Sequence, residues 1–156
     1  MILSLRLAEL GIVLPAVAAP VAAYVPAKVH GDLVYTSGQL PMDSGVILAT
    51  GRVGDGEGSV PPAVAGQLAR QCALNALSAA GAAVGSIDRL GGVLKVTGFV
   101  ASDPEVVGQP VVVNGASELL TEIFGDDGAH ARSAVGVAAL PMNAPVEVEV
   151  IFSLRY

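Results

Sequence analysis

The chain has 156 residues, of which 53% are hydrophobic and only 14% are charged, and its net charge at pH 7 is −6. Apolar content of this order excludes a disordered chain, and the length suits one domain with a sizeable core. The 8 lysine and arginine residues form no basic run, so we expect no nucleic-acid partner. The apolar content also exceeds what a small monomer easily buries, which favours a homo-oligomer.

Cysteine and histidine, which often bind metals, are scarce. Cys72 is the only cysteine, which excludes a disulfide framework, fits a cytoplasmic protein and argues against a cysteine-based metal site. His30 and His130 are expected in a turn and a loop, and the sequence gives them no metal-binding spacing. We therefore expect no metal.

The uncharged stretch 10–27 is similar to the end of a secretory signal peptide. Its prolines at positions 15, 20 and 26 would interrupt a membrane-spanning helix. Glu9 beside a single arginine, Arg6, is also a poor positive leader. We interpret the stretch as part of the mature domain and expect no membrane partner.

In chain order, the first predicted element is a short amphipathic helix over residues 3–10, with leucines at spacings of four and three. The proline-punctuated stretch after it is expected to be extended. From Tyr24, two strand-like pieces flank a Gly-Asp turn, which predicts a hairpin that ends in the Ser-Gly-Gln corner around Gly38. The glycine-rich residues 51–58 then predict a flexible loop.

Two long helices are predicted on either side of a central strand over residues 89–102. The first should begin at a Ser59 cap and end near Val84. Its buried face is expected to carry Val64, Leu68, Cys72 and Ala76. The buried stripe of the second helix is expected to be Val112, Ala116, Leu119 and Ile123. With two final strands, the order β-β-α-β-α-β-β predicts an α+β fold, with two helices packed on one face of a mixed sheet.

The last two strands are expected to form a hairpin across the turn Pro-Met-Asn-Ala-Pro. If Val135 and Val137 face the core, alternation places Arg132 on the opposite side. Glu147 and Glu149 alternate with buried valines and would share that side.

Arg132 stands in a stretch with no other Lys, Arg, Asp or Glu, and its guanidinium suits bidentate binding of a carboxylate. An internal salt bridge to Glu147 or Glu149 is the alternative. The glutamates show the ordinary pattern of a solvated strand face. The functional alternative is that a carboxylate facing the cleft orients a water or transfers a proton.

Five segments lie in the order of the signature blocks of the RidA/YjgF family, which the chain resembles from Tyr24 to Phe152. They read YVPAKVHGDLVYTSGQLP, VLKVTGFVAS, VVVNGASELL, HARSAVGVAALP and VEVEVIF. The resemblance implies a chorismate-mutase-like fold and a homotrimer with clefts between its subunits. It also implies hydrolysis of enamines or imines such as 2-aminoacrylate to 2-keto acid and ammonia, without cofactor or metal.

The same resemblance leaves other functions open. A non-catalytic trimer that binds a small carboxylate or keto acid is the main alternative. The endoribonuclease or translation-inhibitor label of some relatives fits this acidic chain least.

Site residues follow from the resemblance by position. It implies that Arg132 clamps the substrate carboxylate and that Glu147 positions the attacking water. Tyr24 would line the cleft from the neighbouring subunit. Gly38 would supply a backbone contact, and Asn114 a polar group at the rim.

The chain also departs from the family pattern. Ala134 stands where deaminases often have cysteine, so a thiol contribution is absent and only a backbone contact to substrate remains. His130 replaces a proline, and the 51–58 loop is longer than usual. Residues 1–15 are an added N-terminal helix and extended segment within one expected domain over 1–156.

Overall fold

The structure of the chain is a computed structural model that describes residues 1–18 and 23–155. The helices are α1 (Leu3–Glu9), α2 (Pro62–Val84) and α3 (Gln109–Phe124), with short 3-10 turns η1 (Ile87–Arg89), η2 (Gly125–Gly128) and η3 (Pro141–Asn143). The main-sheet strands are β1 (Ala27–His30), β2 (Leu33–Thr36), β5 (Leu90–Ala101), β6 (Ala131–Val137) and β7 (Val146–Leu154). A separate small hairpin is formed by β3 (Met42–Asp43) and β4 (Val46–Ile47).

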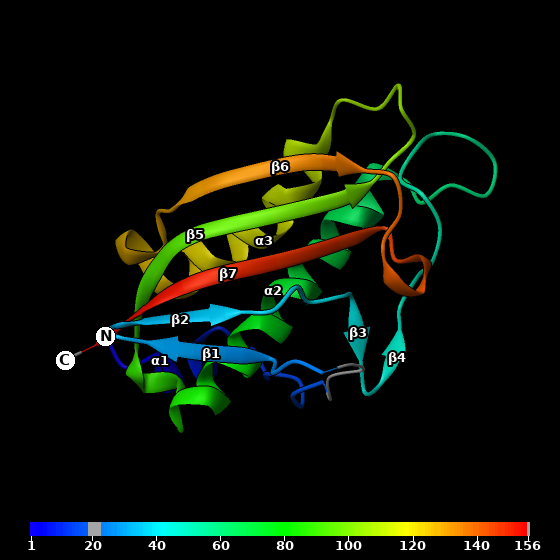
Figure 1. Ribbon diagram of the computed structural model, residues 1–156. Helices are drawn as coiled ribbons and strands as arrows, with labels where there is room; N and C mark the ends of the chain where they lie inside the picture. Colours follow the sequence, from blue (N-terminus) through cyan, green and yellow to red (C-terminus); the bar gives the residue numbers. More distant parts are fainter. Residues whose placement is uncertain (19–22, 156) are drawn as a thin grey trace.

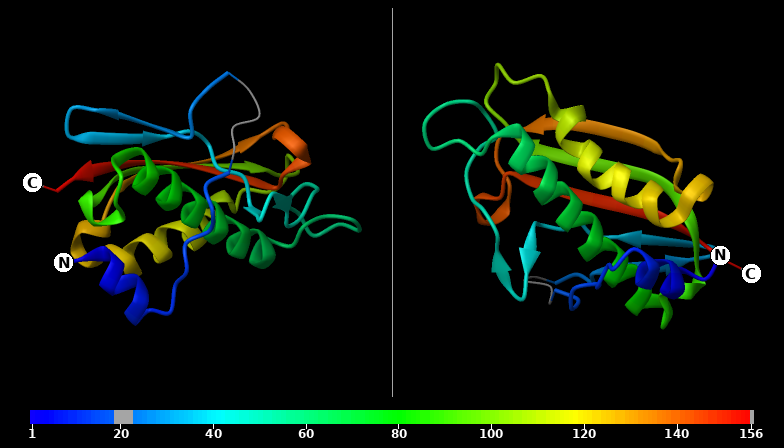
Figure 2. Two further views of the ribbon diagram at one scale, coloured as in Figure 1. Left: turned by 90° about the horizontal axis from the view of Figure 1, so that it is seen from below. Right: turned by 180° about the vertical axis from the view of Figure 1, so that it is seen from behind.

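The main sheet has the order β1-β2-β7-β5-β6, in which only β5 and β6 run parallel (Figure 1). Helices α2 and α3 cover one face of this sheet, and no helix of the described residues lies on the other face (Figure 2). The predicted mixed α+β sheet with two helices on one face is therefore confirmed. None of the helices in the described residues is long and apolar enough to cross a membrane.

Helix α3 packs as its apolar pattern predicts. All four stripe positions, Val112, Ala116, Leu119 and Ile123, are buried against the sheet. It also crosses α2 at very short range, because a Cβ on Gly115 would lie 1.9 Å from the backbone oxygen of Gly66. Gly115 is thus required by the helix packing rather than by a turn.

Helix α2 differs from the prediction in its first turn. Val64 is 45% exposed, and Ala65 takes the buried position in its place. A strict four-residue repeat turns about 40° per step away from the 3.6-residue period, so a stripe extended over three steps leaves the core.

The predicted Ser59 cap is also wrong. The helix begins at Pro62, with Pro61 as an extended N-cap and no side-chain cap bond. A residue before proline avoids helical conformation, which delays the start of the helix past Ser59.

The expected hairpin of the last two strands does not form, because β5 lies between β6 and β7. The segment β5-α3-β6 is a crossover unit that returns β6 parallel to β5. Strand β7 then runs antiparallel along the other side of β5. As a result β6 is an edge strand of the described sheet.

The faces of β6 are the reverse of the expected ones. Val96 and Val100 of β5 are fully buried under the helices, and their register partners are Arg132 and Gly136. Ala134 packs against the core on this same side, while Val135 is 44% exposed on the helix-free face. Small residues on the core side of β6 let α3 approach the strand closely. The sequence pattern predicts the opposite, because valines that alternate with small residues usually face the core.

In β7 the predicted faces are correct. Val146, Val148 and Val150 are buried, and Glu147 and Glu149 lie on the helix-free face. Arg132 and Glu147 therefore lie on opposite faces of the sheet within one chain.

Candidate functional site

Arg132 is held by helix α3. Its Nη1 donates to Asn114 Oδ1 at 2.7 Å and to Ser117 Oγ at 3.2 Å. Asn114 and Ser117 are three residues apart on α3 and so project from one side of the helix. The structure thus brings together the predicted residues Arg132 and Asn114, and adds Ser117.

The guanidinium of Arg132 has no carboxylate partner among the described residues. The ion pairs of this part of the chain are Arg6–Glu9, Arg52–Asp103 and Arg70–Glu122. The alternative of a salt bridge from Arg132 to Glu147 or Glu149 is wrong, because the sheet separates them. Within residues 1–18 and 23–155, Nε and Nη2 of Arg132 also meet no hydrogen-bond acceptor. A half-buried cation of this kind suits an anionic ligand.

A further pair of side chains extends this network. Ser117 Oγ lies 2.9 Å from His130 Nε2, and His130 Nδ1 lies 2.6 Å from the carbonyl oxygen of Gly128. A carbonyl oxygen only accepts, so Nδ1 carries a proton. In the tautomer that is protonated at Nδ1 alone, Nε2 accepts from the Ser117 hydroxyl.

The sequence analysis predicts a loop at His130 and assigns no role to Ser117. The sequence signal for both residues is their spacing to the predicted site residues Asn114 and Arg132. Ser117 follows Asn114 by one helical turn, and His130 precedes Arg132 by two residues at the start of a strand.

Glu147 and Gly38 meet on the helix-free face. A Cβ on Gly38 would lie 1.7 Å from Glu147 Oε1, so the carboxylate rests against backbone that no side chain covers. Burial raises the pKa of Glu147, and the nearby Glu149 raises it further. A carboxyl group with a raised pKa is suited to exchange protons with a substrate or water.

Tyr24 precedes β1 in a segment that approaches Gly38. Its side chain is 46% exposed. The carbonyls of the next two residues, Val25 and Pro26, accept hydrogen bonds from Ser37, the neighbour of Gly38. The segment that carries Tyr24 is thus tied to the same end of β2 as Gly38.

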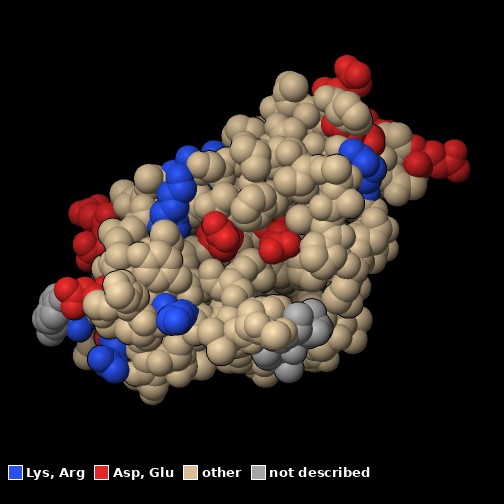
Figure 3. Space-filling model, in the orientation of Figure 1, with Lys and Arg blue, Asp and Glu red and all other residues tan. Residues whose placement is uncertain are grey.

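The six predicted site residues therefore form two groups. Arg132, Asn114 and Ala134 belong to the helix-covered side of the β6 edge, which we call the arginine group. Glu147, Gly38 and Tyr24 form the second, which we call the glutamate group, with its carboxylate on the helix-free face. Figure 3 views that face and shows small acidic areas inside a broad uncharged surface.

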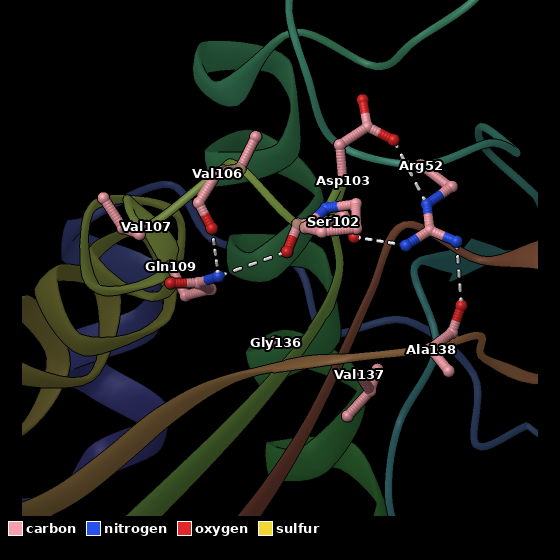
Figure 4. Close-up of a pocket in the computed structure, with 10 residues that line it drawn as sticks. Arg52, Ser102, Asp103, Val106, Val107, Gln109, Gly136, Val137 and Ala138 are labelled. Atoms are coloured by element: carbon pink, nitrogen blue, oxygen red, sulfur yellow. Dashed lines mark hydrogen bonds and ion pairs between the residues drawn. The ribbon is translucent and has the colours of Figure 1, made fainter.

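A cavity of about 430 Å³ lies at the far end of β6 and contains none of these six residues (Figure 4). Arg52 at its edge pairs with Asp103 and donates to the carbonyls of Ser102 and Ala138. Gln109 donates to Ser102 Oγ and to the carbonyl of Val106 (Figure 4). The polar groups of this cavity thus bind one another and tie the predicted 51–58 loop to the ends of β5 and β6.

Metal ligation has no visible basis in the part of the chain that the structure describes. No group of three or more histidine, cysteine, aspartate or glutamate residues is arranged there to hold a metal ion.

Comparison with known proteins gives a consistent result. The model of the family described as YjgF/chorismate mutase-like, putative endoribonuclease matches residues 4–154. Protein TCP17 of Trypanosoma cruzi is 42% identical over 151 residues, which cover 96% of this chain and 92% of that protein.

Two solved structures resemble the whole chain. A protein of unknown function from Agrobacterium tumefaciens is 44% identical, with a TM-score of 0.86 over 99% of this chain and 93% of that one. A protein described as a putative endoribonuclease from Shewanella oneidensis is 29% identical, with a TM-score of 0.91 over 99% and 100% of the two chains.

A more distant solved structure contains a small ligand. TdcF from E. coli, with bound serine, is 27% identical, with a TM-score of 0.57 over 91% of this chain and 93% of that one.

Proposed function

Because the chain belongs to the YjgF/chorismate mutase-like, putative endoribonuclease family, we propose that it binds small carboxylates at Arg132 and hydrolyses enamines or imines of the 2-aminoacrylate type. The observation that carries this proposal is the guanidinium of Arg132. Neutral oxygens of α3 hold its Nη1, and no carboxylate of the described chain neutralises it. The serine bound to TdcF carries the same carboxylate chemistry.

The separation of the two groups implies an assembly. A single chain holds the arginine group and the glutamate group on opposite sides of its sheet, so one ligand cannot touch both. A second copy can supply the missing half if its helix-free face meets the β6 edge of the first. We therefore propose a homotrimer with a site at each subunit junction. Exposed apolar side chains on that face, including Tyr35 and Val135, support it.

The proposed reaction needs little chemistry from the protein. The carboxylate of an iminium substrate is held by Nε and Nη2 of Arg132. A water molecule adds to the electrophilic carbon and gives one proton to Glu147. Glu147 returns this proton to the amino nitrogen of the resulting carbinolamine. The C–N bond then breaks as the hydroxyl proton passes to solvent, which releases ammonia and leaves the 2-keto acid. Orientation and a poised water supply most of the rate increase.

The first experiment measures ammonia and pyruvate released from freshly generated 2-aminoacrylate. We expect Arg132→Ala and Glu147→Gln to lose most of this activity. Arg70→Ala, which removes an arginine from an exposed pair between α2 and α3, is the matched control and should keep it. Equal rates for wild type and Arg132→Ala would exclude the proposal, and a sedimentation mass of the 15.6 kDa monomer would exclude the shared site.

A non-catalytic carboxylate-binding protein is the second candidate. One observation favours it: the arginine group is complete within one chain, whereas turnover requires Glu147 from elsewhere. Saturable binding of pyruvate that is lost in Arg132→Ala, without ammonia release, would establish this function in place of hydrolysis.

A further inference from the structure

We infer that Ser117 and His130 are positioning residues that hold the guanidinium of Arg132 in the orientation a carboxylate requires. The inference deepens the proposed function and rests on it for the ligand. It starts from one continuous chain of hydrogen bonds, which runs from the Gly128 carbonyl through His130 and Ser117 to Arg132.

The division of donors on Arg132 is the first step. Arginine has five N–H groups, and the two on Nη1 have Asn114 and Ser117 as acceptors. Three N–H groups on Nε and Nη2 remain. One from each nitrogen points in parallel with the other, which matches the two oxygens of a carboxylate. Fixing Nη1 therefore presents the bidentate edge of the side chain.

The role of His130 follows from the chemistry of a serine hydroxyl. A serine inside a helix often donates its hydroxyl proton to the carbonyl one turn earlier. Here Nε2 of His130 lies within reach and accepts the hydrogen bond of the hydroxyl instead, which leaves a lone pair of Ser117 Oγ directed at Arg132. The Gly128 carbonyl fixes the ring by accepting from Nδ1. His130 thus determines which way the Ser117 hydroxyl points.

The side chains that bind Nη1 of Arg132, Asn114 and Ser117, carry no charge. An aspartate or glutamate in the place of Ser117 would anchor Arg132 but would also neutralise it. Amide, hydroxyl and imidazole groups anchor the guanidinium while its positive charge stays available to a ligand. The residues that position Arg132 come from three parts of the chain. Ser117 lies on α3, Gly128 ends η2, and His130 immediately precedes β6.

The test compares Ser117→Ala and His130→Ala with wild type. Ser133→Ala is the matched control, because Ser133 adjoins Arg132 but faces the other side of β6, where it accepts from Lys95. Ser117→Thr keeps the hydroxyl, and His130→Gln keeps an acceptor near the place of Nε2. Thermal unfolding of every variant identifies any that fail to fold, and the two conservative variants then decide the outcome.

The first readout needs no ligand. Nitrogen-15 NMR should show the Nδ1–H tautomer of His130 and slow rotation of the Arg132 guanidinium in wild type and Ser133→Ala. Rotation should become faster in Ser117→Ala and His130→Ala and slow again in Ser117→Thr. Rotation that is equally slow in Ser117→Ala and in wild type would overturn the inference.

The second readout is pyruvate binding by calorimetry. We expect the dissociation constant to rise about tenfold in Ser117→Ala and His130→Ala, as for the loss of one hydrogen bond to a charged group. Unchanged affinity in both variants would also overturn the inference. If wild type binds no pyruvate while Ser117→Ala still frees the guanidinium, the proposed function fails and the positioning of Arg132 is supported.

Discussion

Gly38 offers a sharp test of the glutamate group. Gly38 does not have a positive φ, so alanine fits its backbone, but the new Cβ would lie 1.7 Å from Oε1 and 2.7 Å from Cδ of Glu147. These atoms form the far end of a flexible side chain, so we expect the carboxylate of Glu147 to move and the fold to remain. The stability cost should lie near the lower end of overpacking, about 1 kcal/mol, or roughly 2–4 °C in Tm.

The effect of Gly38→Ala on activity should be larger than its effect on stability. If Glu147 is the proposed general base, its displacement should lower kcat about 10²-fold or more. Because displacement takes the carboxylate out of its half-buried position, the pKa of Glu147 should also fall toward its usual value, as measured by carbon-13 NMR. Gly108→Ala is the control, since nothing lies within 4 Å of the added Cβ there. A Gly38→Ala variant with wild-type kcat and an unchanged Glu147 pKa would refute this reasoning.

Three further predictions concern ionisation and packing. Because its folded pKa is raised, Glu147 favours folding below its unfolded pKa and opposes folding once the pH exceeds its folded pKa. Glu147→Gln should therefore raise the free energy of unfolding near pH 8 but not near pH 3, and equal gains at both would contradict this. Burial raises the pKa of the Cys72 thiol well above its usual value. Iodoacetamide should therefore label Cys72 at pH 8 only after the protein is unfolded in urea. Rapid labelling of the folded protein would contradict the burial of this thiol. In Gly115→Ala the added Cβ meets the backbone of Gly66, which cannot move aside. Calorimetry should therefore show that the free energy of unfolding falls by about 1–3 kcal/mol. An unchanged Tm would mean that α2 and α3 separate freely.

Much of the fold could be predicted because its signals are local. The α3 stripe was correct at every position, since three turns of amphipathic helix keep one face toward the sheet. The alternation in β7 was also correct, because its buried positions are three valines and Phe152 and its other positions include two charged residues. The first turn of α2 was wrong where a simple four-residue repeat was extended too far.

The sequence could predict which residues form the candidate site, but not where these residues lie relative to one another. The motif order identified the family, which the comparisons confirm. It also pointed to Arg132 and Asn114, which the structure joins, and to Gly38 and Glu147, which it also joins. Ser117 and His130 were missed because a serine in a helix and a histidine before a strand have no distinctive local pattern.

The sequence by itself determined which strands alternate and which residues carry charge. Only the tertiary structure decided that β5 separates β6 from β7, and that α3 covers the Arg132 side of β6. The physical reason is that alternation distinguishes two faces of a strand without saying which one meets the core. That choice depends on a helix and a neighbouring strand distant in the chain, and here it places Arg132 and Glu147 on opposite sides of one sheet.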